Sequence, residues 1–295
     1  MTRDARPKFT RARLRKLAGR AGLYLAALLV ALFVLAPFAW LVISSVAPEA
    51  ELLTVPLHWW PRHASLDRYV AILTTTDINS SAYTFRRALV NSSEVAFGTT
   101  ALSLAVGVPA AYALARSRFR GRRVLTLFFL ATYMLPAIAL VVPLYLILSR
   151  LGLKDTITGL VLVYSSFVTP FVVWIMRGYF AAVPVEIEEA ARIDGCSRIQ
   201  TFFRVGLPLS LPGLVTTVIF AVLLAWDEFF YALILTSSLH AKTISVAIAE
   251  FTGQHMIDYG MIATGGVLAS LPPVLLAFLL QKYIIPGLAA GAVKG

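Results

Sequence analysis

Six long apolar runs dominate this chain and limit what it can fold into. Each run is long enough, at about 1.5 Å per helical residue, to cross the roughly 30 Å hydrocarbon layer of a bilayer. Only 14% of the 295 residues are charged, against about 25% in soluble domains. The sequence therefore predicts an all-α polytopic membrane protein with six spans, at about residues 23–46, 89–115, 124–148, 157–180, 209–235 and 261–284.

The first apolar run is expected to remain in the protein as a membrane span. It extends from Leu23 to about Val46, whereas a secretory signal peptide has a shorter apolar core and a small-residue cleavage site. The chain then divides into a basic N-terminal tail, a six-helix transmembrane domain and a C-terminal tail, at residues 1–20, 21–287 and 288–295. The expected loops are two external ones at about 47–87 and 237–260, and a polar one at 184–208.

Basic residues fall mainly on one side of the predicted spans. If the N-terminus is inside, most of the 26 Lys and Arg residues are inside too, on the N-terminal tail, the 116–123 turn, the 184–208 loop and the C-terminal end. Cytoplasmic segments carry such an excess. Seven basic residues fall outside, and Arg86 and Arg87 are the pair among them that fits least well, because they lie next to a span. We therefore expect a multi-pass protein of the cell inner membrane, with both termini in the cytoplasm.

Several kinds of chemistry are not expected of this chain. It lacks a G-x-x-x-x-G-K-[ST] phosphate loop, so no ATP site is expected, and it shows no nucleophile set, so no catalytic residues are assigned. Cys196 is the lone cysteine, and the four histidines are too scattered for a metal site. The net charge of +11 comes from short basic runs between apolar segments, which does not indicate nucleic-acid binding.

A polar hairpin at Pro184–Pro208 separates the fourth and fifth predicted spans. Pro184 can open a short helix, whose positive end favours the carboxylates that follow. Gly195 stands where the end of a helix requires a residue at positive φ. The run Ser197-Arg198-Ile199-Gln200 is a capping box that starts a second short helix. Ala190-Ala191 lets a partner surface come close, so the hairpin is interpreted as a docking element.

The spacing within this hairpin resembles the EAA loop of ABC-importer permeases. Glu189-Ala190-Ala191 is followed by three residues, Gly195, nine residues and then Val205-Gly206-Leu207-Pro208. Val205 in place of the family's Ile is the single departure. The resemblance implies that the loop couples this chain to a separate ATPase, through Glu186, Glu189, Ala190, Ala191, Asp194 and Gly195.

Asp227 and Glu228 lie inside the fifth predicted span, between Trp226 and Phe229. A carboxylate at mid-membrane costs about 2.5–3.5 kcal/mol on insertion scales, so it is expected to face a cavity or a partner. Carboxylates beside an aromatic face suit a sugar site. A structural hydrogen bond to a neighbouring helix or subunit is an equal alternative, because adjacent helical residues point roughly 100° apart.

The similarity extends over most of the chain, to the carbohydrate branch of these permeases and its maltose-type second permease. It rests on the loop, on Trp226-Asp227-Glu228-Phe229, where the family commonly has W-N-E-F, and on the tail ending Gly291-Ala292-Val293-Lys294-Gly295. Asp227 departs from the commoner Asn, so amide hydrogen bonding is not carried over there.

This resemblance implies partners on both sides of the bilayer. They are a second, homologous permease forming a heterodimer, two ATP-binding subunits that carry ATP and Mg, and an extracytoplasmic sugar-binding protein. The resemblance also implies that the second external loop reaches the binding protein, through Thr252, Gly253 and Gln254. It implies that the tail contacts the ATPase pair, through Val293, Lys294 and Gly295.

The sequence therefore predicts a permease subunit that forms half of a translocation pathway for a sugar, of di- or oligosaccharide size, and that contains no ATPase of its own. An importer of a polyamine or a glycerophosphodiester is an alternative. A stand-alone secondary transporter is a weaker one, because that class shows internal repeats, and no clear repeat is visible here.

Overall fold

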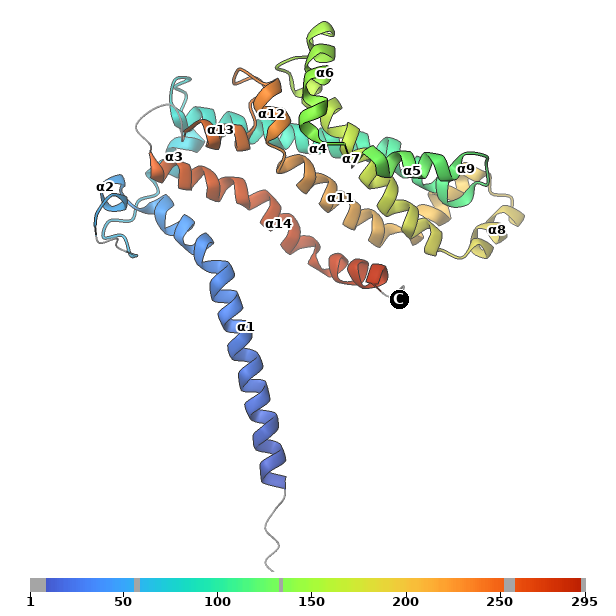
Figure 1. Cartoon of the computed structure of the whole chain (residues 1–295), viewed down its shortest axis with the longest axis horizontal. Coiled ribbons are helices and arrows are strands. Elements are labelled where there is room, and N and C mark those ends of the chain that lie inside the picture. Colours follow the sequence, from blue (N-terminus) through green and yellow to red (C-terminus); the bar gives the residue numbers. More distant parts are fainter. Residues whose placement is uncertain (1–8, 56–58, 133–134, 252–257, 293–295) are drawn as a thin grey trace, which may run out of the picture. The chain divides into compact units, whose positions relative to one another are not determined.

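The computed structural model describes residues 9–55, 59–132, 135–251 and 258–292, and every regular element among them is helical (Figure 1). The elements are α1 (Phe9–Val46), α2 (Glu49–Leu52), α3 (Asp67–Thr74), α4 (Ser81–Arg116), α5 (Arg122–Thr132), α6 (Ala137–Arg150), α7 (Ile157–Ala182), α8 (Val185–Ile193), α9 (Arg198–Thr201), the π-helical turn η1 (Phe202–Gly206), α10 (Leu207–Leu209), α11 (Leu211–Trp226), α12 (Phe230–Leu235), α13 (Ile244–Phe251) and α14 (Tyr259–Ala292). The prediction of an all-α protein is confirmed for this part of the chain.

Among the described residues, four helices are long and apolar enough to cross a membrane. They contain Lys16–Val46, Ser81–Arg116, Ile157–Ala182 and Tyr259–Leu279, which correspond to the first, second, fourth and sixth predicted spans. A fifth span is present if Arg198–Leu209 and Leu211–Trp226 count as one, although they are bent by 78°. The count of six spans therefore stays a prediction. Three boundaries differ, since α1 extends into the expected N-terminal tail, α4 begins at Ser81 instead of residue 89, and α14 continues to Ala292, inside the expected C-terminal tail.

The third and fifth predicted spans are not single helices. Residues 124–148 are divided between α5 and α6, with Pro136 at the N-cap of α6, because proline lacks an N–H and disfavours helix before it. Residues 209–235 are interrupted between Trp226 and Phe230, where α11 ends and α12 begins. Neither of these predicted spans is therefore one uninterrupted helix.

The chain divides into two compact units. One comprises Met1–Arg68 with Tyr259–Val267, and the other comprises Tyr69–Asp258 with Leu268–Gly295. In the first unit, the Glu49 carboxylate accepts from the N–H groups of Tyr259 and Gly260 at 3.1 Å each, which caps the start of α14. Arg68 donates to the carbonyl of Ala47 at 2.7 Å and forms an ion pair with Glu49.

The core of the second unit lies where α4, α7 and α11 pack together (Figure 1). A Cβ added at Gly107 of α4 would lie 2.7 Å from Cγ1 of Val172 on α7, so only glycine allows this approach. Small residues at membrane-helix contacts have this effect generally. The buried cluster continues toward the polar loop through Val108, Ala111, Val168, Val172, Met176, Phe180, Phe202 and Ala221.

The predicted external loop at 237–260 contains α13 and is held to α4 by side chains. Asn91 donates to the carbonyls of Leu239 and Lys242 at 3.0 and 2.9 Å, and the Ile244 N–H donates to Ser92. Asp155, before α7, also fixes the start of this loop. Its partial burial would raise its pKa, but hydrogen bonds from Ser237 and Ser238 outweigh burial, so the pKa of Asp155 is lowered.

Candidate functional site: the polar loop and the break in the fifth predicted span

The first helix of the polar loop, α8, has the geometry that its sequence predicts. Pro184 is its N-cap, and Glu186 and Glu188 lie in its first turn, where the positive end of the helix favours carboxylates. Gly195 follows at φ +91°, and the next N–H, of Cys196, donates back to the carbonyl of Ala191 at 3.0 Å. The predicted positive φ at Gly195 is confirmed, and it allows the chain to reverse after α8.

The second helix, α9, begins at the predicted capping box. Ser197 Oγ accepts from the Gln200 N–H at 3.3 Å, and Gln200 Oε1 accepts from the Ser197 N–H at 2.8 Å. Each side chain thus satisfies a backbone donor of the other residue. Both short helices lie beyond the ends of α4 and α7 (Figure 1), so the loop is a formed hairpin attached to the helical core.

The surface of this loop is the part available to a partner. Of the predicted coupling residues, Ala191 is half-buried and the others are exposed: Glu186, Glu189, Ala190, Asp194 and Gly195. The structure adds two that sequence reasoning missed, Ile193 at 86% and Ile199 at 72% exposed. Exposed apolar groups beside carboxylates are typical of an interaction surface. Their signal in the sequence was an isoleucine on either side of Gly195 in a polar segment.

Glu188 has a different role from the neighbouring carboxylates. Its side chain is buried, and it accepts from Tyr112 Oη and Arg116 Nε of α4, both at 2.8 Å. Arg116 also donates to the carbonyl of Val183, between α7 and α8, at 2.8 Å. A Cβ added at Gly206 would lie 3.0 Å from the Tyr112 ring. The glycine of the Val205–Pro208 motif therefore allows Tyr112 to pack closely against this segment.

This cluster fixes α8 to the end of α4, because a buried carboxylate bound by two donors has little freedom to move. Charge-assisted hydrogen bonds of this length are stronger than neutral ones. Sequence reasoning placed Glu188 with the carboxylates at the start of α8 and Arg116 in a basic turn. It did not pair them, because the two residues lie far apart in the chain.

The residues from Trp226 to Phe229 lie at the break between α11 and α12. Glu228 accepts from the N–H groups of Tyr231 and Ala232 at 3.0 and 3.2 Å, so its carboxylate caps α12. These N–H groups would bond to backbone carbonyls in a continuous helix, which is why the helix breaks here. For Glu228 the geometry favours the structural alternative, as a helix cap.

Asp227 and Trp226 have opposite environments at this break. Asp227 is exposed and is the C-cap of α11, so its carboxylate is available to a ligand. Trp226 is 5% exposed, and its indole N–H donates to the Ala269 carbonyl of α14 at 3.0 Å. Its ring packs in the core, so it offers no open face to a sugar. Phe229 is 38% exposed and is the aromatic group nearest in sequence to Asp227 that remains accessible.

Two sets of predicted contact residues lie outside the described part of the chain. They are the binding-protein candidates Thr252, Gly253 and Gln254, and the tail residues Val293, Lys294 and Gly295. Their roles stay predictions. Among the described residues, no group of three His, Cys, Asp or Glu side chains is arranged to hold a metal ion.

Comparison with known proteins gives the family. Residues 103–290 match the family described as "Binding-protein-dependent transport system inner membrane component". The trehalose/maltose transport system permease protein MalG of Thermococcus litoralis is 36% identical, over 92% of this chain and 96% of the relative. The trehalose transport system permease protein SugB of Mycobacterium tuberculosis is 36% identical over 90% and 95%, and the sulfoquinovosyl glycerol transport system permease protein SmoH of Agrobacterium fabrum is 32% identical over 94% and 95%.

The fold has a counterpart among solved structures. A chain from a bacterial ABC transporter that imports the acidic polysaccharide alginate matches with a TM-score of 0.72, over 95% of this chain and 99% of that one. Its sequence identity is 23%, so this likeness concerns the fold. The family match and the relatives establish the assignment: the chain belongs to the inner membrane components of binding-protein-dependent transport systems, the permease subunits of ABC importers.

Proposed function

We propose that this chain forms half of the translocation pathway for a di- or oligosaccharide, in a heterodimer with a second, homologous permease. Two separate subunits would bind ATP and Mg, and an extracytoplasmic sugar-binding protein would deliver the substrate. The observation that carries the proposal is the formed α8–α9 hairpin, which exposes Glu189, Ile193 and Ile199 and is anchored to the core through Glu188. The sugar assignment is supported by the names of the relatives, which include trehalose and maltose systems.

The proposed mechanism is a transfer of movement through the hairpin. ATP binding brings the two ATPase subunits together, and α8–α9, held by one of them, moves with it. Because Glu188 is bound to Tyr112 and Arg116, the displacement of α8 passes to α4. An effector shifts an equilibrium only as far as it binds the two states differently. ATP would therefore favour the outward-open state because the ATPase subunit binds this loop and moves it.

Sugar specificity is tested by uptake into vesicles that contain the assembled importer, its binding protein and internal ATP. We expect a labelled di- or oligosaccharide to accumulate, and a polyamine or a glycerophosphodiester to be excluded. Accumulation of either of the latter with no sugar uptake would replace the sugar assignment and leave the importer assignment intact. A stand-alone secondary transporter does not fit the family, which depends on a binding protein.

The proposed topology predicts the side of the membrane for each loop. A reporter fused after Gly121 or Gly195 is expected to be cytoplasmic, and one fused near Ala64 or Gly253 is expected to be external. The reason is the excess of Lys and Arg in the segments assigned to the cytoplasm. Paired reporters, one active only inside and one only outside, make the measurement. An external Gly195 fusion would contradict both the topology and the docking role of the loop.

The break at Asp227–Phe229 predicts a separation of roles between two adjacent carboxylates. Asp227→Asn is expected to impair sugar uptake with assembly intact, by about ten- to one-hundredfold if one charge-assisted hydrogen bond to the substrate, worth about 1.5–3 kcal/mol, is lost. Glu228→Gln is expected to lower thermal stability, because the acceptors for the Tyr231 and Ala232 N–H groups are weakened. Loss of subunit assembly in both variants would show that both carboxylates are structural.

A further inference from the structure

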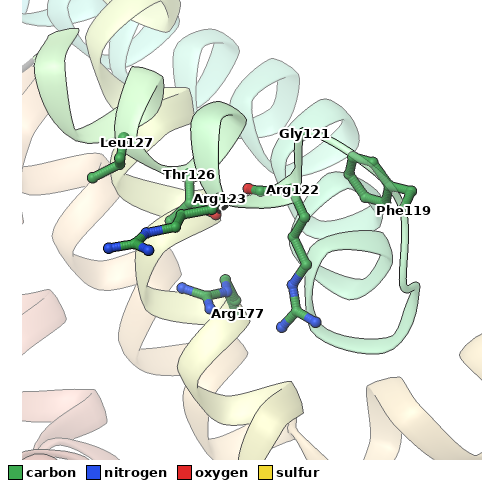
Figure 2. Close-up of a pocket in the computed structure, with 7 residues that line it drawn as sticks. All are labelled: Phe119, Gly121, Arg122, Arg123, Thr126, Leu127 and Arg177. Atoms are coloured by element: carbon green, nitrogen blue, oxygen red, sulfur yellow. Dashed lines mark hydrogen bonds between the residues drawn. The ribbon is translucent and has the colours of Figure 1, made fainter.

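A basic cavity of about 410 Å³ lies between α5 and α7, at the end of α7 that leads into the α8–α9 hairpin. Its lining includes Arg122, Arg123 and Arg177, with Thr126 and Leu127 on the same wall. Figure 2 shows Arg122 and Arg123 of α5 and Arg177 of α7 around the cavity, with Arg123 and Arg177 extending to the same side of the view and Arg122 extending downward. The positive charge of this cavity therefore comes from two helices, α5 and α7, that are far apart in the sequence.

The arginines of this cavity lack an anionic partner within the described residues. The ion pairs there involve Arg68, Arg116 and Lys242, and none involves Arg122, Arg123 or Arg177. The Nε of Arg177 is fully buried and has no hydrogen-bond acceptor in the described part of the chain. Like charges repel when held together, and a buried donor without an acceptor is unfavourable. The cavity is therefore suited to an anion that supplies several acceptors.

We propose that this cavity binds the phosphate of an anionic phospholipid in the cytoplasmic leaflet. The planar guanidinium fork matches phosphate oxygens, and two arginines can each donate paired hydrogen bonds. Helix α5 begins at Arg122, a lining residue, so the positive end of this helix lies at the cavity and favours an anion there. The leaflet follows from the proposed orientation of the chain, and the site itself does not depend on that orientation.

Apolar groups beside the cavity identify a lipid as the source of the phosphate. Val124, Leu127 and Phe128 follow one another at helical spacing on α5 and are 70%, 55% and 62% exposed, which gives acyl chains a surface next to the arginines. Trp174 on α7 is 54% exposed and lies one turn from Arg177. Tryptophan is enriched at the level of lipid headgroups, and basic pockets between spans bind anionic ones. A free phosphate ion would leave this apolar surface uncovered.

The test is native mass spectrometry of the assembled importer after detergent exchange, counting retained phosphatidylglycerol, with phosphatidylcholine as the neutral comparison. The Arg123→Gln/Arg177→Gln variant is expected to retain phosphatidylglycerol at least about tenfold more weakly, since each basic group near the surface contributes about fivefold. Arg177→Lys, which keeps the charge and loses the planar fork, is expected to fall between this variant and the unchanged protein. It also keeps the test open if the double variant fails to assemble.

The matched control is Arg118→Gln/Arg120→Gln, which removes the same number of charges from the turn before α5, at residues outside the cavity lining. Retention of phosphatidylglycerol in this control is expected. Equal losses in the two double variants, or a loss in neither, would overturn the proposal. So would binding of radiolabelled inorganic phosphate with no lipid retained, or release of the ATPase subunits with lipid retention unchanged, which would make the cavity a protein interface. The reporter fusions test orientation separately from these outcomes.

Discussion

Gly195→Val is expected to give a chain that inserts into the membrane but does not respond to the ATPase subunits. Gly195 lies at φ +91°, where a β-branched residue is strained by about 1–3 kcal/mol. No atom lies within 4 Å of the added Cβ, so the effect comes from the backbone and not from a clash. Relief of the strain would reorient α9 relative to α8, which removes Ile199 from the surface presented to a partner.

Glu189→Lys is expected to have the same outcome for a different reason. Glu189 is exposed in the middle of α8, so its replacement leaves the fold of the hairpin unchanged. If it pairs with a basic group of the ATPase, its loss costs about 2–5 kcal/mol, largely because the partner charge is left desolvated and unpaired. Glu189→Gln, which keeps the shape, is expected to be milder than the charge reversal.

The measurements for both variants are retention of the ATPase subunits during purification, ATP hydrolysis stimulated by the binding protein, and sugar uptake. The matched control is Gly152→Val. Gly152 is also at positive φ, +67°, and a Cβ added there would have no atom within 4 Å, but this residue lies in the turn after α6 and not in the hairpin. We expect Gly152→Val to be strained yet to stay coupled. Full stimulation in both hairpin variants would mean that the loop does not couple this chain to ATP hydrolysis.

Features of the hairpin that depend on neighbouring residues were predictable from the sequence. The capping box depends only on Ser197 and Gln200 being three residues apart. The end of α8 depends only on a glycine that can adopt a positive φ, which is Gly195, so no distant contact decides either feature. The same holds for the apolar runs, whose length alone identifies α4 and α7 as candidate spans. In these cases the determining interaction lies within one or two turns.

Features decided by competition or by distant residues were not predictable. The run through Asp227 and Glu228 was apolar enough to suggest one helix, but the Glu228 carboxylate takes the N–H groups that would continue it. Pro136 was visible in the sequence, yet apolarity alone does not decide whether a proline bends a span or divides it. The pairing of Glu188 with Arg116 depends on how α4, α7 and α8 pack. A single sequence offers no signal for that arrangement.

The buried pair of Arg116 and Glu188 carries the other large expected effect. Glu188→Ala would leave the Arg116 guanidinium largely buried, with the Val183 carbonyl as its remaining acceptor. Removing one member of a buried ion pair costs about 3–5 kcal/mol. We expect lower thermal stability of the purified complex and a loss of ATPase stimulation, because α8 is no longer fixed to α4.

The double variant Arg116→Met/Glu188→Leu separates stability from coupling. Replacing both members of a buried pair with apolar side chains is often neutral or stabilising, so thermal stability is expected to recover in part, because the Tyr112 hydroxyl and the Val183 carbonyl still lose their partners. Coupling is expected to stay impaired, because apolar contacts do not fix α8 at one angle as the hydrogen bonds to Glu188 do. Recovery of both properties would mean that the pair contributes packing alone.

The control pair is Lys242 with Glu250, which is in the segment assigned to the opposite face of the membrane and is more exposed, with Glu250 at 33%. Lys242→Ala and Glu250→Ala are each expected to change stability by at most about 1 kcal/mol, as is usual for partly exposed pairs. ATPase stimulation is expected to be unaffected in both. If these variants uncoupled the importer as strongly as Glu188→Ala, the effect would reflect general destabilisation, and the link from α8 to α4 would lose its support.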